Sequence, residues 1–134
     1  MDIKIFALRL KPGMDLKASL WEFIQANGIQ AGFILTTVGS LKRVSLRLAG
    51  QSDSQIFEGK FEIVSLVGTL SQDGLHLHIS ISDSEGKTIG GHLTNGSIIN
   101  TTAEIVIGES HYYRFTRTVD EQTGYKELQI EQRG

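Results

Sequence analysis

Residues 75–82 read LHLHISIS, a strict alternation of apolar and polar side chains. This alternation predicts a half-buried β-strand, because successive side chains of a strand point to opposite faces of the sheet. The leucines and isoleucines of this segment are expected in the core, and His76 and His78 are expected side by side on the outer face. Two neighbouring imidazoles on a polar face form a candidate metal site.

A third histidine follows in residues 83–93, which read DSEGKTIGGHL. A three-residue hairpin loop that ends at Gly86 would use the left-handed conformation that glycine favours. In the antiparallel pairing that this loop produces, His92 lies opposite His78, and the two Cβ atoms are about 4.5–5.5 Å apart on one face. A two-residue loop would send His92 to the other face, and a bulge at the paired glycines would also break the count. The position of Gly86 favours the first register.

The expected triad of His76, His78 and His92 predicts a metal site with zinc as the cofactor. Three imidazoles leave a fourth position open, as in catalytic zinc sites rather than closed structural ones. Imidazole is a poor ligand for hard cations, which disfavours magnesium and calcium. The alternative is that the histidines are ordinary polar residues on an exposed strand and bind nothing.

The chain has 134 residues, no cysteine and a net charge of −2. This length predicts a single domain, residues 1–134, with a substantial core. Without cysteine there are no disulfides and no thiolate ligands. The absence of a long apolar run and of a signal-like N-terminus predicts a cytoplasmic protein without a membrane partner. The acidic balance argues against strong DNA binding by this chain alone, and the basic residues at 42–47 and 114–117 are typical of solvent-facing strands.

The remaining segments predict one helix near the start and many strands. Asp15 suits a helix N-cap, apolar residues follow at helical spacing, and Asn27 with Gly28 suits a C-terminal stop. In the strand at 41–48 the alternation places Ser45 on the outer face. The predicted strands are residues 3–10, 31–38, 41–48, 61–70, 75–82, 88–93, 102–107, 112–118 and 125–130. The predicted fold class is therefore α+β, a single domain made mainly of antiparallel β-sheet with a few helices.

A series of short motifs resembles a known family. The motifs are GSL at 39–41, GKFEIVSL at 59–66, GTL at 68–70, the histidine segments between 76 and 93, TTAE at 101–104 and TGYKEL at 123–128. In this order, and over nearly the whole chain, they are similar to the plant and prokaryote conserved (PPC) domain of the prokaryotic type.

The resemblance implies a compact domain with a large antiparallel sheet, assembled as a homotrimer. Prokaryotic members are often described as DNA-binding, and plant members carry AT-hooks with an Arg-Gly-Arg core, a sequence that is missing here. The histidine pattern is associated with a bound metal in prokaryotic members, which implies the same three ligands. Glu62 matches a family motif that lies near subunit contacts.

Two functions follow as hypotheses. The first is a homotrimeric metal-binding protein, with zinc-dependent hydrolysis of esterase type on an unknown small substrate as the catalytic alternative. That alternative needs a general acid or base, for which Glu62 and Glu104 are candidates, and substrate-orienting groups, for which Thr94, Asn95 and Ser97 are candidates. The second is an assembly module associated with DNA, either directly or through a partner protein.

Overall fold

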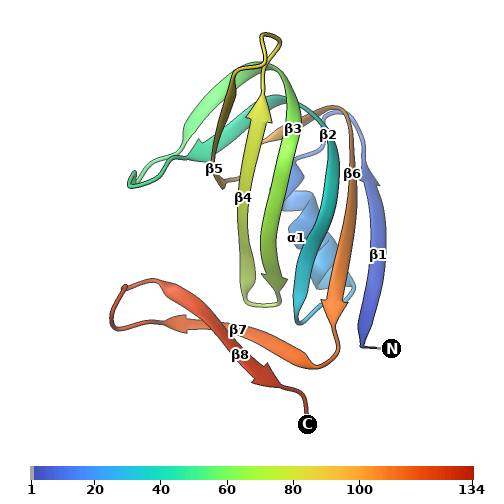
Figure 1. Ribbon diagram of the computed structural model, residues 1–134, viewed down its shortest axis with the longest axis vertical. Coiled ribbons are helices and arrows are strands. Elements are labelled where there is room, and N and C mark those ends of the chain that lie inside the picture. Colours follow the sequence, from blue (N-terminus) through green and yellow to red (C-terminus); the bar gives the residue numbers. More distant parts are fainter. Residues whose placement is uncertain (1) are drawn as a thin grey trace.

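The computed structural model describes residues 2–134 and confirms an α+β fold dominated by antiparallel sheet (Figure 1). Within these residues there is one α-helix rather than a few. The elements are β1 (Ile3–Leu10), α1 (Leu16–Ala26), β2 (Gly32–Arg47), β3 (Gln55–Ser71), β4 (Gly74–Ser82), β5 (Thr88–Leu93), β6 (Ile98–Ser110), β7 (Tyr113–Val119) and β8 (Lys126–Gln132).

The main sheet has six strands in the order β1-β6-β2-β3-β4-β5, and every pair is antiparallel. The long strand β2 pairs near its end with β5 as well, which places Arg47 directly opposite His92. Strands β2 to β5 therefore close on themselves, while β6 and β1 extend the sheet to one side. In Figure 1 helix α1 lies behind β2 and β6, on the face of the sheet that is turned away from the viewer.

Helix α1 begins and ends where the sequence predicts. Asp15 is the N-cap, and its carboxylate accepts a hydrogen bond of 3.0 Å from the backbone N–H of Ala18. Asn27 is the C-cap, and Gly28 takes a left-handed conformation with φ of 60°. The inner face of the helix joins the sheet to form one core, to which it contributes the fully buried Leu16, Leu20 and Ile24.

The histidine hairpin adopts the predicted register. His78 lies opposite His92, and no register shift interrupts the ladder between β4 and β5. Gly86 has φ of 82°, and the backbone N–H of Asp83 donates to the carbonyl of Lys87 at 2.9 Å, as in a three-residue loop that ends in a left-handed residue. A side chain at Gly90 would come within 2.7 Å of a backbone oxygen of β4, so this glycine permits the close pairing instead of forming a bulge.

Strand β2 departs from the prediction of two separate strands. Residues 31–38 and 41–48 were expected to be divided at Gly39, but β2 runs continuously from Gly32 to Arg47 with bulges along its pairing with β6. Gly39 has a packing role there, because a Cβ atom at this position would lie 2.1 Å from the carbonyl oxygen of Thr102. Ser45, which was expected to face outward, is only 4% exposed.

Strands β7 and β8 form a separate two-stranded sheet after β6. In Figure 1 this hairpin lies beyond the end of the main sheet at which β3 turns into β4. The contact is direct, because the backbone N–H of Arg117 donates to the carboxylate of Asp73 in that turn at 2.9 Å. In residues 2–134 no helix is both long enough and apolar enough to cross a lipid bilayer.

Candidate metal centre

The three predicted histidines converge on the outer face of the sheet. His76 and His78 share a face of β4, and pairing with β5 brings His92 beside them. The distance between ring centroids is 4.5 Å for His78 and His92, 5.0 Å for His76 and His78, and 5.9 Å for His76 and His92. His111 is the fourth histidine and lies elsewhere, directly after β6.

The geometry and chemistry of this triad fit a zinc ion. One nitrogen from each ring lies within 4.8 Å of the other two. A tetrahedral zinc with Zn–N bonds of about 2.0–2.1 Å requires nitrogens about 3.3 Å apart. His76 and His78 are exposed and His92 is half-buried, so modest ring rotations on an open face can supply the difference. Three imidazole donors match zinc better than magnesium or calcium.

The surroundings of His76 and His92 lower their pKa values, which favours the neutral form of the imidazole that binds a metal. Burial lowers the pKa of His76 below its usual value of 6.5, and the positive charges of Arg117, His78 and Arg47 lower it further, while Glu127 opposes them. Burial is also the main cause that lowers the pKa of His92, and the positive charge of Arg47 is the next. Protonation of one ring also disfavours protonation of its neighbours, because like charges repel.

A cleft of about 580 Å³ adjoins the triad and includes His76 and His92 in its wall. One side comes from β2 and the segment that follows it, and the other side comes from the β7–β8 hairpin. Besides the two histidines, its wall is formed by Arg47, Gly50, Gln51, Ser52, Leu75, Arg117, Tyr125, Lys126 and Glu127. Arg117, Tyr125, Lys126 and Glu127 were not predicted as site residues, because they are more than twenty positions away from the histidines and reach them only through packing of the hairpin.

The two predicted catalytic carboxylates do not join the triad within one chain. Glu62 pairs with Ser82, which is four residues beyond His78 on β4. At about 3.3 Å per residue this is roughly 13 Å along the strand. Glu104 lies on β6 opposite Arg9 of β1, on the far side of β2 and β3 from the histidines. Both side chains are exposed.

Two of the predicted substrate-orienting residues, Ser97 and Thr94, have hydrogen bonds to Ser45 of β2. Ser97 is fully buried, and its hydroxyl accepts a hydrogen bond of 2.9 Å from the backbone N–H of Ser45. The hydroxyl of Thr94 lies 2.7 Å from that of Ser45. Asn95 is exposed and borders a different hollow, beside Trp21 of α1. None of the three residues lines the cleft beside the triad.

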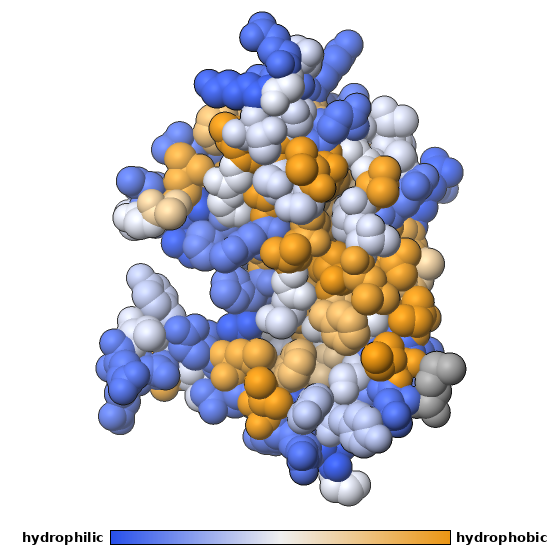
Figure 2. Space-filling model, in the orientation of Figure 1, coloured by the Kyte–Doolittle hydropathy of each residue, from blue (hydrophilic) through white to orange (hydrophobic). Residues whose placement is uncertain are grey.

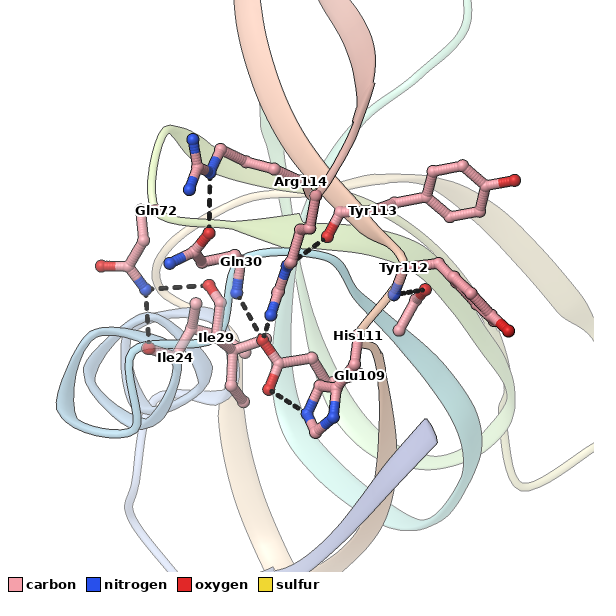
Figure 3. Close-up of polar contacts among 11 residues, drawn as sticks. Ile24, Ile29, Gln30, Gln72, Glu109, His111, Tyr112, Tyr113 and Arg114 are labelled. Carbon is pink, nitrogen blue, oxygen red and sulfur yellow. Dashed lines mark hydrogen bonds and ion pairs between the residues drawn. The ribbon is translucent and has the colours of Figure 1, made fainter. Parts of the chain in front are cut away.

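A polar cluster around Glu109 anchors the hairpin that forms one wall of the cleft (Figure 3). The carboxylate of Glu109 accepts a hydrogen bond of 2.8 Å from the backbone N–H of Gln30, and the Gln30 side-chain oxygen accepts one of 2.8 Å from Nε of Arg114. Gln72 donates to the carbonyls of Ile24 and Ile29 at the end of α1. These bonds attach β7, the end of β6 and the turn between β3 and β4 to the end of α1 and the residues that follow it.

Residues 2–111 match the Plants and Prokaryotes Conserved (PCC) domain, and the chain belongs to this family. Two bifunctional GlmU proteins from strains of Synechococcus are each 48% identical to it over 130 residues. These matches cover 97% of this chain but 21% of each relative, so the chain spans about a fifth of their length.

Solved structures show the same fold. A protein from Salmonella enterica is 42% identical with a TM-score of 0.95, over 98% of this chain and 95% of that one. A proposed DNA-binding protein from Bacteroides thetaiotaomicron is 25% identical with a TM-score of 0.82, over 93% of this chain and 91% of that one. A protein from Archaeoglobus fulgidus, described as metal-containing, is 28% identical with a TM-score of 0.80, over 94% of this chain and 93% of that one.

Proposed function

We propose that this chain is a metal-binding protein in which His76, His78 and His92 hold one zinc ion. The observation that carries this proposal is the convergence of the three ring nitrogens within 4.8 Å of one another on one sheet face. The lowered pKa values of His76 and His92 favour the neutral ligand form at neutral pH. The description of the Archaeoglobus relative as metal-containing supports the same reading.

The open fourth position would let bound zinc polarise a ligand or a water molecule. Esterase-type hydrolysis is not part of the proposal, because Glu62 and Glu104 lie away from the triad and Thr94 and Ser97 have structural hydrogen bonds. We therefore assign binding rather than catalysis to the site.

We further propose that three copies assemble through the outer face of the sheet, as the resemblance to the family implies. A row of cross-strand neighbours connects His76 through Thr69, Phe33 and Gly108 to Ile5, so this face continues from the histidines to β1. Figure 2 shows apolar surface over the central and right-hand part of this view. The exposed apolar side chains on β1, β2 and β3 include Ile5, Leu35, Val38, Val64 and Val67. A partner copy would remove this surface from water.

Direct DNA contact is not proposed for this chain. The basic side chains at 42–47 and 114–117 do not form one free stripe, since Arg43 pairs with Glu58 at 2.9 Å and Arg114 donates to Gln30. A net charge of −2 gives no general attraction to phosphate backbones.

Elemental analysis of the protein without an affinity tag tests the metal assignment. We expect about one zinc per chain, and we expect His78→Ala to lose it, because two imidazoles alone bind zinc weakly. His111→Ala is the matched control and should retain the zinc. If His78→Ala keeps the metal of the wild type, the assignment is wrong.

Light scattering during size-exclusion chromatography tests the assembly. The expected mass is about three times the chain mass of 14.8 kDa. Val38→Glu places a charge on the outer face and should lower the mass, whereas Val119→Glu on β7, at a site that is equally exposed, should not. A monomeric wild type would exclude the trimer.

A further inference from the structure

Positive charge collects in the cleft beside the triad, although the whole chain is slightly acidic. The wall of the cleft carries Arg47, Arg117 and Lys126 against one carboxylate, that of Glu127. We propose that this cleft binds a small organic phosphate monoester, with the phosphate group between Arg47 and Arg117 beside the metal position. The placement beside the metal depends on the proposed zinc site, whereas the cationic cleft is a property of the fold itself.

Arg47 is fixed next to the triad by strand pairing. It lies directly opposite His92 where β2 meets β5, and opposed residues share a face with Cβ atoms about 4.5–5.5 Å apart. Its Nη1 donates to the carbonyl of Gln51 at 3.3 Å, in the segment that forms the same wall. A metal-bound ligand beside His92 would therefore lie within reach of this guanidinium.

Arg117 faces the cleft from the hairpin and is held in place before any ligand binds. Its Nη2 donates to the hydroxyl of Thr69 at 3.1 Å, and its Nη1 donates to the carbonyl of Lys126 at 3.2 Å. Each Nη of a guanidinium carries two N–H groups, and these two bonds use one from Nη1 and one from Nη2. The group therefore retains donor capacity that an anion can use, at little further cost in side-chain entropy.

The charge and size of the cleft favour a phosphate monoester over a carboxylate or a bare ion. Guanidinium groups bind phosphate oxygens through paired hydrogen bonds, and a dianion balances several positive charges beside a divalent metal better than a monoanion does. A volume of about 580 Å³ is within the range of small-molecule sites and leaves room for an organic group. Tyr125, which is 71% exposed in the same wall, offers an aromatic face for that group.

Calorimetric titration of phenyl phosphate into the zinc-loaded full chain tests the inference. We expect saturable binding, and at least tenfold weaker binding of benzoate, which has the same ring but one negative charge. Arg47→Gln should weaken phenyl phosphate binding at least tenfold while zinc content and melting temperature stay unchanged. Lys126→Gln, at an exposed position in the same wall, provides a second variant and should weaken it at least threefold. Arg43→Gln, on the same strand but paired with Glu58, is the control and should bind as the wild type does.

Absence of binding to the zinc-loaded protein, equal affinity for benzoate, or equal effects of Arg43→Gln and Arg47→Gln would each overturn the inference. Zinc content is measured on the same samples, so a protein that holds zinc but not phenyl phosphate refutes only this inference. A protein that holds no zinc refutes the proposed function, and titration of that metal-free protein still decides about the cleft. If the metal-free protein binds phenyl phosphate and Arg47→Gln abolishes this binding, the cleft assignment is supported. If the metal-free protein does not bind phenyl phosphate, the cleft assignment is refuted.

Discussion

Glu109 at the end of β6 and Arg133 after β8 form an ion pair in which Nη2 of Arg133 lies 3.2 Å from Oε2 of Glu109. The glutamate side chain is only 9% exposed. The same oxygen accepts the backbone N–H of Gln30, so one sheltered carboxylate joins the α1–β2 connection, β6 and the segment after β8. This relationship explains how a two-stranded hairpin outside the main sheet keeps a fixed place beside the histidines.

Glu109→Gln should lower the free energy of unfolding by about 1–3 kcal/mol, because an amide cannot replace the charge-assisted bonds of a sheltered carboxylate. Urea denaturation measures this loss. Glu58→Gln is the matched control, since Glu58 also pairs with an arginine but is 66% exposed. Its loss should stay below about 1 kcal/mol. Equal losses in the two variants would show that burial of Glu109 is unimportant.

Ser97→Ala tests the structural role assigned to a residue that was first a candidate for substrate positioning. Its hydroxyl accepts from the N–H of Ser45 and donates to the carbonyl of Thr94 at 3.1 Å, and removing it leaves buried groups unpaired. We expect a loss of about 1–3 kcal/mol in the free energy of unfolding, without change in zinc content. Ser84→Ala in the exposed hairpin loop should change stability by less than about 0.5 kcal/mol. A loss of zinc in Ser97→Ala would contradict this assignment.

The parts of the site that the sequence predicted are those defined by local geometry. Alternation along β4 determines which face His76 and His78 occupy, and the left-handed Gly86 determines the register that brings in His92. Both signals are contained within a single hairpin, so neither depends on the rest of the chain.

The parts that were missed depend on pairing between distant segments. Arg47 adjoins His92 only because β2 pairs with both β3 and β5. Arg117 lies on a separate hairpin, which the hydrogen bonds around Glu109 hold in place. Ser45 is polar in an alternating segment, and its hydroxyl finds a partner in that of Thr94, which lies far along the chain. No periodicity in the sequence encodes these contacts.

Gly68→Ala should destabilise the protein and weaken the metal site together. A Cβ atom at Gly68 would lie 2.3 Å from the carbonyl oxygen of His76, so β3 and β4 must move apart at the strand that carries two ligands. We expect a loss of at least about 2 kcal/mol in the free energy of unfolding by urea denaturation, as for other overpacked sites. Zinc affinity measured by competition with a chelator should fall in parallel. Gly134→Ala, where an added Cβ meets nothing within 4 Å, should leave both unchanged.

Acid should destabilise the metal-free protein through His76 and His92. The pKa values of His76 and His92 are lowered in the folded state below the ordinary value of 6.5, so between the two values the unfolded chain binds more protons. The free energy of unfolding therefore rises with pH across this window, and the stabilisation is lost as pH falls from about 6.5 through the lowered pKa values. Urea denaturation of metal-free protein at several pH values measures the slope.

The variant for this measurement is His76→Gln, which should flatten the slope. Zinc adds to the effect, because metal and protons compete for the same nitrogens and the zinc-loaded protein must release zinc as the rings protonate. The pH dependence of stability should therefore be steeper with zinc than without it. An identical slope in His76→Gln and the wild type, both without metal, would show that the protonation of His76 is not coupled to folding.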